Sequence, residues 1–369
     1  MTAEDTVSPL RVVILQDYLR NGGTEQQTLA IAEEIAKLGA ETHIIVFRRG
    51  GVLDERAASL PITLHFLNQG PLKTDWYAPG LRAKLKSIAP HAVLPMGRMA
   101  NCLTSLLPSK APYSLFSTFR TGRSIPFLYR RALKRADHII ANSQEALKRL
   151  ADQYGIKRAN NSTVIYNGCI RDFETVIPSF HPDGKGSGAK RIRFCSVSMF
   201  RPQKQQIRLI QICSRLPKEI DWELALAGEG PTRVACEEEA RRLGVSDRVR
   251  FLGLLKDPRS LYFDSDIAVH TSDLESLPNF LVEAQMAGLP VVAYDVNGVG
   301  ETFLDQKSGF LIPHGNEFEF QKALEKLAQN LDLRLQMSEQ ARYYAQDNFS
   351  LKSQSDAYFR LFQTSIDKD

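Results

Sequence analysis

The sequence has few of the features that assign a protein to a class at sight. None of its apolar runs approaches the roughly 18–20 residues that a membrane-spanning helix needs. Its first residues include Glu4 and Asp5, whereas a secretory signal begins with positive charge. We therefore expect this chain of 369 residues to be a cytoplasmic protein.

Cysteine is scarce, and its spacing carries no pattern. The five cysteines are Cys102, Cys169, Cys195, Cys213 and Cys236. An odd, scattered set without a C-x-x-C pair disfavours a disulfide framework and a cysteine-rich zinc site, and core or surface thiols are the simpler interpretation. The seven histidines form no H-E-x-x-H motif, which disfavours a metalloprotease.

Acidic residues are missing from one long stretch of the chain. Residues 76–136 hold eleven Lys and Arg and no Asp or Glu. Residues 1–175 hold 23 basic and 15 acidic residues and residues 176–369 hold 24 and 27, so the net charge of +5 hides a polarised chain. We expect the basic half to face an anionic partner. Nucleic acid is not that partner, because the chain has no zinc-finger motif, RNA-recognition motif or basic tail.

The hydrophobic pattern indicates two α/β domains. Short runs rich in β-branched residues, such as 11–16 and 42–47, are separated by a helical pattern over 24–38. This alternation is typical of a parallel sheet. The alternation restarts with a predicted strand at 193–197, and the length and the 43% hydrophobic content suit two globular domains.

Residues 178–190 separate the two patterns. They contain two Pro, three Gly and two Ser, a composition typical of a linker. The predicted organisation is a first domain over 1–177, this linker, a second domain over 191–348, and a helix over 349–369 that packs back on the first domain. Ligands of such sheets bind beyond the carboxyl ends of the strands, so we expect a cleft between the domains to hold the site.

Two glycine-containing turns follow predicted strands. Gly22 and Gly23 come after the first strand, and Asn297, Gly298 and Glu301 belong to a turn after a strand at 291–294. Glycine lets the backbone approach a ligand, and the N–H groups of such turns can bind phosphate. A tight turn without a ligand would need the same residues. The first turn does not have the spacing of a dinucleotide-binding fingerprint or a P-loop, which disfavours both classes of enzyme.

Arg201 and Lys204 follow a predicted strand of the second domain. Two cations three residues apart can hold one diphosphate, because arginine supplies a planar fork and lysine a mobile point charge. The alternative is a pair of solvated surface charges, which is the usual state of such residues.

Glu275 and Glu283 lie eight residues apart on either side of Pro278. Proline suits the start of a helix, so Glu275 is expected in the loop before the helix and Glu283 about one turn inside it. Carboxylates near this N-terminus can accept hydrogen bonds from sugar hydroxyls. The alternative is that the two acids only favour the helix dipole, which is worth about 0.3–1 kcal/mol.

One segment resembles a known family signature. The two glutamates in E-x7-E spacing, followed by residues 287–293 (AGLPVVA) and the turn that ends in Glu301, resemble the signature of the family 4 retaining glycosyltransferases. Further segments fit the pattern of that family in the same order along nearly the whole chain: 22–24, 141–143, 164–168, Arg201 with Lys204, 228–231 and 249–253.

The resemblance implies a GT-B fold, which is an α/β architecture of two Rossmann-like, doubly wound parallel-sheet domains facing a central cleft. It implies that Glu283 binds the ribose of a nucleotide sugar, that Glu275 contacts hydroxyls of the transferred sugar, and that Arg201 and Lys204 neutralise the diphosphate. It also implies a site without metal or cofactor. The other donor-binding candidates are Gly22, Gly23, Ser276, Leu277, Pro278, Asn279, Asn297, Gly298, Glu301, Gly228 and Glu229, and the acceptor candidates of the first domain are Arg120, Arg123, Arg98 and Asn167.

The chain departs from the family pattern at two positions. Many members carry a histidine after a strand of the first domain, where this chain has residues 117–123 (STFRTGR) without histidine, and we expect Arg120 at that place. The second domain opens its phosphate loop with Ser198 and Met199 instead of Gly-Arg, and we expect Arg201 to supply the missing guanidinium.

Residues 127–135 (FLYRRALKR) combine apolar and basic residues at helical spacing. Such a helix can lie on an anionic membrane, where each basic residue contributes about 1 kcal/mol. It can equally be a helix that packs on the core and solvates its basic face.

The function predicted from these observations is a retaining hexosyltransferase. Its donor is a UDP- or GDP-linked sugar and its acceptor a lipid-linked or polysaccharide glycan of the cell envelope, with a possible contact of residues 76–136 with the membrane surface. The alternatives are a nucleotide-sugar epimerase or a phosphorylase on the same fold, and a non-catalytic module that binds anionic lipid.

Overall fold

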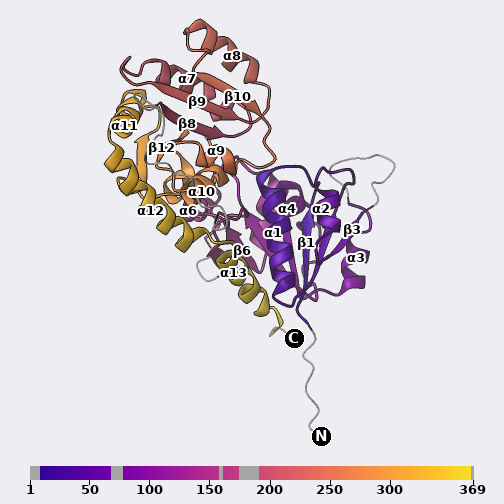
Figure 1. Ribbon diagram of the computed structural model, residues 1–369. Coiled ribbons are helices and arrows are strands. Elements are labelled where there is room, and N and C mark those ends of the chain that lie inside the picture. The colour runs from indigo at the N-terminus through magenta and orange to yellow at the C-terminus, as the bar shows by residue number, and fades with distance from the viewer. Residues whose placement is uncertain (1–8, 68–77, 158–160, 174–190, 367–369) are drawn as a thin grey trace. The chain divides into compact units, whose positions relative to one another are not determined.

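The computed structural model describes residues 9–67, 78–157, 161–173 and 191–366 (Figure 1). The chain divides into two compact units. Unit 1 comprises residues 1–170 and 350–369, and unit 2 comprises residues 171–349. The first division therefore falls at residue 170 and not at 177, and the predicted linker over 178–190 lies outside the described residues.

Unit 1 contains one parallel sheet, whose seven described strands follow the order β3-β2-β1-β4-β5-β6-β7. This order reverses direction at β1, as in a doubly wound fold. The strands are β1 (Arg11–Gln16), β2 (Glu41–Val46), β3 (Thr63–Phe66), β4 (Ala92–Met96), β5 (Ser114–Phe119), β6 (His138–Ala141) and β7 (Ser162–Val164). The helices are α1 (Gly23–Lys37), α2 (Asp54–Ala58), α3 (Leu81–Ile88), α4 (Arg98–Thr104), α5 (Phe127–Arg135), α6 (Gln144–Tyr154) and α13 (Leu351–Gln363).

Unit 2 repeats the plan with six described parallel strands in the order β10-β9-β8-β11-β12-β13. These strands are β8 (Ile192–Val197), β9 (Trp222–Ala227), β10 (Val249–Gly253), β11 (Ile267–His270), β12 (Val291–Asp295) and β13 (Gly309–Pro313). The other elements are α7 (Gln206–Ser214), α8 (Arg233–Arg242), α9 (Arg259–Phe263), α10 (Asn279–Met286), α11 (Glu317–Gln329), α12 (Leu331–Phe349) and the short helices η1 (Pro202–Lys204) and η2 (Asn297–Glu301).

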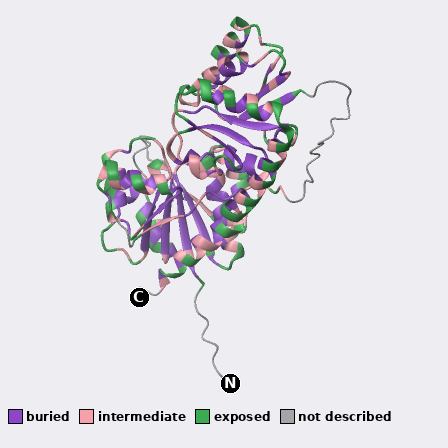
Figure 2. Cartoon of the chain, turned by 90° about the vertical axis from the view of Figure 1, so that its left-hand side faces the viewer, coloured by how far each residue is buried: buried purple, intermediate pink, exposed green. Residues whose placement is uncertain are grey.

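Both sheets are covered by helices on their two faces, which explains the continuous apolar runs of their central strands. In β1, Val12 and Ile14 pack in the cluster that contains α1 and α13, whereas Val13 and Leu15 pack against α3 and α4. Figure 2 shows the result, because the strands are buried along nearly their whole length and the exposed residues lie on the outer sides of the helices. The five cysteines are free and buried, which confirms the interpretation as core thiols.

The sequence did not reveal β3, β7 and β13, and these three strands lie at sheet edges. β3 and β7 have no fully buried residue, so neither shows a clear apolar pattern. β13 ends in Pro313, which lacks an N–H for a ladder hydrogen bond. The weak sequence signal of β3 and β7 therefore follows from their partial exposure.

The final helix α13 follows unit 2 in the sequence but packs in unit 1. Tyr358 and Phe362 are fully buried in the same cluster as α1, and the Phe362 ring meets Phe116 of β5 edge-on with the centroids 5.0 Å apart. Gln354 Nε2 donates to Gln27 Oε1 of α1 at 3.0 Å and to the Tyr166 carbonyl at 2.9 Å. The helix thereby joins α1 to the segment that follows β7 (Figure 1).

We predict that Phe362→Ala lowers the free energy of unfolding by about 3–5 kcal/mol, because it leaves a cavity in the unit 1 core. Lys352→Ala, at an exposed position of the same helix, is the control and should change stability by less than about 0.5 kcal/mol. Urea unfolding of both variants tests this prediction. Equal stability of the two variants would contradict the placement of α13 in the unit 1 core.

Candidate functional site

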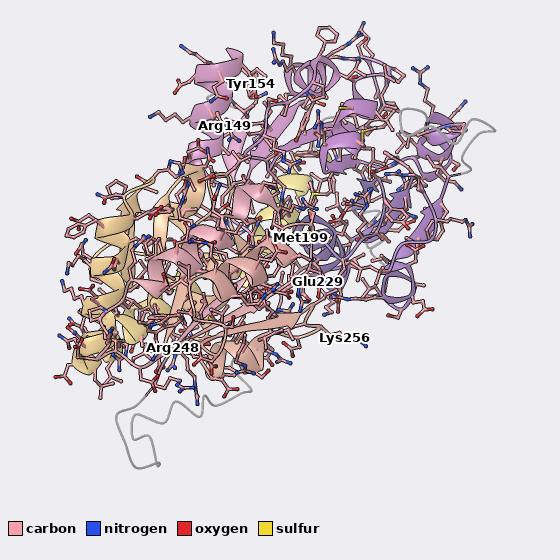
Figure 3. All side chains as sticks on the ribbon, turned by 90° about the horizontal axis from the view of Figure 1, so that it is seen from above. Arg149, Tyr154, Met199, Glu229, Arg248 and Lys256 are labelled. Carbon is pink, nitrogen blue, oxygen red and sulfur yellow. The ribbon has the colours of Figure 1, made fainter. Side chains whose placement is uncertain are left out.

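The loops after β8, β9 and β10 form one layer at the carboxyl edge of the unit 2 sheet. The Phe200 N–H donates to the Glu229 carbonyl at 3.0 Å, and the Gly228 N–H donates to the Gly253 carbonyl at 2.7 Å. Gly228 has a φ of +140°, and a Cβ there would lie 2.0 Å from the Ser198 carbonyl oxygen. Only glycine permits this approach. Figure 3 shows the side chains of Met199 and Glu229 close together in this layer.

The turn η1, which carries Lys204, is fixed to the loop after β11. The Asp273 N–H donates to the Gln203 carbonyl at 2.8 Å, and Ser272 Oγ donates to the same carbonyl at 3.0 Å. Thr271 Oγ1 donates to the Gln205 carbonyl at 3.0 Å. Three consecutive residues of one loop therefore bind the backbone of the other, and they place Lys204 beside the residues that follow.

A charged network supports the outer side of the same loop. Asp273 Oδ1 accepts from Arg208 Nη1 at 3.0 Å and lies 2.8 Å from His314 Nε2. Gln205 Nε2 donates to the other oxygen of Asp273 at 2.5 Å. Burial raises the pKa of Asp273, but the bonds from His314 and Gln205 and the charge of Arg208 outweigh burial and lower it. The loop therefore carries an ionised aspartate at neutral pH.

Glu275 Oε1 is held from two sides. Lys204 Nζ lies 2.5 Å from this oxygen, and Nε2 of His270, the last residue of β11, lies 2.7 Å from it. The Glu275 N–H donates to Asn297 Oδ1 of η2 at 3.3 Å, so the loop after β12 also contacts this residue. No other described residue donates to the second carboxylate oxygen, Oε2.

Glu275 is ionised although its side chain is only 10% exposed. Burial raises the pKa of this carboxyl, but the hydrogen bond and charge of His270, together with Lys204, outweigh burial and lower the pKa to about 2. Because an ionised carboxylate only accepts hydrogen bonds, the His270 Nε2 that faces it carries a proton.

Glu283 lies in α10 and is 8% exposed. Its Oε2 accepts a hydrogen bond of 2.8 Å from the Tyr262 hydroxyl of α9, and Arg171 Nε lies 3.3 Å from the same oxygen. Burial raises the pKa of Glu283 in spite of the Arg171 charge and the Tyr262 hydrogen bond. Within the part of the chain that the structure describes, Oε1 has no donor, so this glutamate, like Glu275, has one oxygen held and one without a described partner.

Arg171 is the first residue of unit 2, and its side chain binds the start of this unit to the rest of it. Its guanidinium lies 3.5 Å from Asp257 as well as against Glu283. Arg259 Nη1 donates to the Asp172 carbonyl at 2.8 Å, and the Phe173 ring lies 6.1 Å from that of Tyr262. The buried side of Glu283 is therefore built by the segment that enters unit 2.

In unit 1, Arg120 follows β5 directly. Its Nη2 donates to Asn167 Oδ1 at 2.5 Å, and its Nη1 donates to the Tyr358 hydroxyl of α13 at 3.3 Å. Arg149 of α6, labelled in Figure 3 with Tyr154 of the same helix, donates to the Thr121 and Gly122 carbonyls and fixes the loop after Arg120. No described residue offers Arg120 a carboxylate.

Two family models match most of the chain between them. The model described as "Glycosyltransferase Family 4" matches residues 21–172, and the model described as "Glycosyl transferases group 1" matches residues 180–344. The chain belongs to the family 4 glycosyltransferases. This confirms the family that the E-x7-E segment suggested.

Named relatives and a solved structure agree with this assignment. The lipopolysaccharide core biosynthesis glycosyltransferase LpsE of Rhizobium meliloti strain 1021 is 26% identical over 354 residues, which are 93% of this glycosyltransferase and 96% of LpsE. LpsD of the same strain is 29% identical over 155 residues, 42% of this chain and 45% of LpsD. HepE of Anabaena, solved with UDP, shares the fold with a TM-score of 0.81 at 20% identity, covering 96% of this chain and 100% of HepE.

The structure brings together some of the residues predicted for the glycosyltransferase site. Lys204 contacts Glu275, Asn297 contacts Glu275, and Arg120 contacts Asn167. Arg201 precedes η1 and is exposed, and no side-chain bond joins it to Lys204 or to another described residue. In unit 2, Ser276, Leu277 and Pro278 precede α10, Asn279 begins it, and Gly298 and Glu301 lie in η2. In unit 1, Gly22 precedes α1, Gly23 begins it, and Arg98 and Arg123 are exposed near the ends of β4 and β5. Their roles stay predictions.

Sequence reasoning missed three residues that shape the site. His270 has no motif around it, and only its position at the end of a strand could have indicated it. Arg171 and Tyr262 lie 112 and 21 residues from Glu283, so their contacts depend on the fold. Glu229 was predicted to bind the donor and here pairs with Arg233 of α8.

No cluster of three His, Cys, Asp or Glu side chains could hold a metal ion within the part of the chain that the structure describes. None of the described helices has the length and apolar composition to cross a membrane.

We predict that Glu275→Gln and Glu283→Gln change the pH dependence of stability in opposite directions. The folded pKa of Glu275 lies below its ordinary value of 4.5, so its stabilisation is complete above pH 4.5 and is lost as the pH falls toward 2. The folded pKa of Glu283 lies above 4.5, so its ionisation lowers stability as the pH rises through that value.

Urea unfolding from about pH 3 to about pH 7 measures these slopes. Relative to the unsubstituted protein, Glu275→Gln should gain less stability as the pH rises, and Glu283→Gln should lose less. The same slope in both variants would contradict the two environments described above.

Proposed function

We propose that this glycosyltransferase is a retaining hexosyltransferase that moves a sugar from a UDP- or GDP-linked donor to a lipid-linked or polysaccharide acceptor of the cell envelope. One observation carries the donor assignment. Glu275 Oε1 lies against Lys204 and His270, and Glu283 Oε2 accepts from Tyr262 and lies 3.3 Å from Arg171 Nε, whereas the second oxygen of each carboxylate has no donor among the described residues. A fixed, unshared carboxylate oxygen suits a sugar hydroxyl, which donates one hydrogen bond.

The two glutamates would then divide the donor between them. Glu275, ionised and beside Lys204, would accept from hydroxyls of the transferred sugar, and Glu283 from the ribose. The backbone of 276–279 at the start of α10 and of 297–301 in η2 would lie along the donor. Gly22 and Gly23 at the start of α1, and Gly228 with Glu229, complete the proposed donor contacts.

Arg201 and Lys204 would bind the diphosphate. Arg201 is exposed and has no ion pair among the described residues, so its guanidinium is available for a phosphate fork. The nucleoside diphosphate gains negative charge as the bond to the sugar breaks, and fixed cations stabilise that charge in the transition state. In other enzymes a divalent metal ion stabilises the charge of a leaving diphosphate. We propose that Arg201 and Lys204 supply this stabilisation here and that the reaction is metal-independent.

Names of relatives support the choice of donor and pathway. HepE has been solved with UDP and with UDP-glucose, and LpsE and LpsD are named for lipopolysaccharide core synthesis. For retention, we propose that the acceptor attacks on the face that the diphosphate leaves, and that the leaving phosphate takes the acceptor proton. No separate protein base is then needed.

The acceptor side of the proposal rests on unit 1. Arg120 bonds only to neutral oxygens among the described residues, so its charge is not compensated. Arg98 follows β4 and Arg120 follows β5, and because these neighbouring strands are parallel, both arginines come after the carboxyl ends of their strands. We propose that these arginines and Arg123 attract a phosphate of the acceptor.

The membrane contact of the acid-free stretch also stays a proposal. In α5 the face with Tyr129 and Leu133 is buried, whereas Phe127 is 74% exposed and Arg131 and Lys134 are exposed. An exposed aromatic ring next to two cations suits an anionic membrane surface. A cytoplasmic location likewise remains a prediction.

We predict that Lys204→Ala and Glu283→Ala each lower the rate of sugar transfer at least about tenfold, because each removes a donor contact. A screen of nucleotide sugars for nucleoside diphosphate release, with and without lipid-linked acceptor, identifies the donor and measures the loss. Lys218→Ala, exposed before β9 at the opposite end of the sheet, is the matched control. Unchanged turnover in both site variants, with folding retained, would refute the proposed donor site.

We predict that Arg120→Gln raises the KM for a phosphate-bearing acceptor about tenfold and leaves the KM for the donor unchanged, because a charge-assisted bond to phosphate is lost. Tyr358→Phe removes only the hydroxyl that Arg120 contacts and serves as the control. If both variants behave alike, or if an acceptor without phosphate is affected equally, Arg120 has a structural role alone.

A further inference from the structure

The proposed function assigns the turn η1 to the donor diphosphate, but Lys204 of this turn already pairs with Glu275. Lys204 Nζ, which we assign to the donor phosphates, lies 2.5 Å from Glu275 Oε1, and its side chain is 20% exposed. Arg201, three residues earlier, is exposed and without an ion pair among the described residues. A diphosphate that binds Arg201 therefore arrives next to an ammonium group that is bound to a carboxylate.

Lysine is suited to change partners, because its charge sits at the end of a flexible four-carbon stem. A diphosphate carries more negative charge than one carboxylate and attracts Nζ more strongly. When Nζ turns toward it, Glu275 Oε1 keeps a single donor, the Nε2 of His270 at 2.7 Å. Without that hydrogen-bond donor, burial would favour the protonated carboxyl, in which one oxygen carries a hydrogen and acts as a donor.

His270 is placed to remain where it is. It ends β11, a central strand of the unit 2 sheet, and its side chain is 3% exposed. Its ring lies 5.9 Å from the ring of Phe280 in α10, at an angle of 57°. The position of His270 in β11 and its contact with Phe280 do not involve Lys204. The bond from His270 to Glu275 can therefore persist when the lysine moves.

We propose that His270 is a positioning residue that holds Glu275 ionised and oriented through Oε1 while Lys204 passes from Glu275 to the donor diphosphate, which leaves Oε2 for a hydroxyl of the transferred sugar. This inference rests on the proposed function, since it concerns the same donor site. No bond to the sugar is made or broken in this step, and His270 keeps its Nε2 proton throughout.

The charged and titratable groups around Glu275 define the pH behaviour. Lys204 of η1 and His270 of β11 act on its carboxylate directly. Asp273, two residues earlier on the same loop, is paired with Arg208 of α7 and His314 after β13. In the free enzyme Lys204 and His270 share Glu275, and in the donor complex His270 alone holds it.

The test compares two variants. His270→Leu removes the hydrogen-bond donor to Glu275 Oε1, and His270→Gln keeps an amide nitrogen that can reach the same oxygen. Steady-state kinetics of the full-length enzyme are measured against pH with the donor found in the screen. The acid limb of the pH profile of kcat reports the pKa in the complex with the nucleotide sugar. The acid limb of the profile of kcat/KM reports the pKa in the free enzyme. We expect the limb of kcat to move up by about one pH unit in His270→Leu, and the limb of kcat/KM to move less because Lys204 remains.

We also expect His270→Leu to lower kcat at least about tenfold at the acid end of the range, and His270→Gln to keep most of the activity. An unmoved acid limb in His270→Leu, or equal losses in both variants with unmoved limbs, would overturn the inference, because both results indicate packing alone.

Thermal unfolding of each variant confirms that it is folded. If the unsubstituted enzyme transfers sugar and His270→Leu matches it, only the inference fails. If the unsubstituted enzyme uses no nucleotide sugar, the proposed function fails.

Discussion

The bond between Lys204 and Glu275 is the contact around which the unit 2 site is arranged. It joins the turn after β8 to the loop after β11, two neighbouring strands of the parallel sheet. The Asp273 N–H and the hydroxyls of Ser272 and Thr271 donate to the carbonyls of Gln203 and Gln205 and hold the two segments together. Asp273 with Arg208 supports them from outside. Without that scaffold, two side chains 71 residues apart would not meet at one carboxylate oxygen.

Burial determines what the two glutamates of the E-x7-E segment can do. Glu275 and Glu283 are both nearly buried, yet their pKa values move in opposite directions. Glu275 has two cationic or hydrogen-bonding partners on one oxygen and is strongly ionised. Glu283 has Tyr262 and Arg171, which do not fully offset burial. Identical residue types in one short motif thus acquire different protonation behaviour from their surroundings, which suits two different contacts with one donor.

Much of the architecture could be predicted from the sequence, because central parallel strands are buried on both faces and leave continuous apolar runs. β1 was predicted with the bounds that the structure shows, and the bounds predicted for β2, β8 and β12 differ from the structure by at most one residue at each end. The edge strands β3 and β7 were missed, since half-exposed strands leave a broken pattern, and β13 was missed although it is mostly buried. The candidate site divides in the same way: Arg201, Lys204, Glu275 and Glu283 were proposed from spacing and resemblance, whereas only the fold brings His270 and Arg171 next to the two glutamates. No local pattern encodes a contact such as Arg171 with Glu283.

The central claim is that Lys204 exchanges Glu275 for the donor diphosphate while His270 retains Glu275. A crystal structure of the full-length protein with a bound nucleoside diphosphate tests it most directly. The account predicts Lys204 Nζ within hydrogen-bonding distance of a phosphate oxygen, and His270 Nε2 still on Glu275 Oε1. A diphosphate bound elsewhere, with the bond between Lys204 and Glu275 intact, would contradict it.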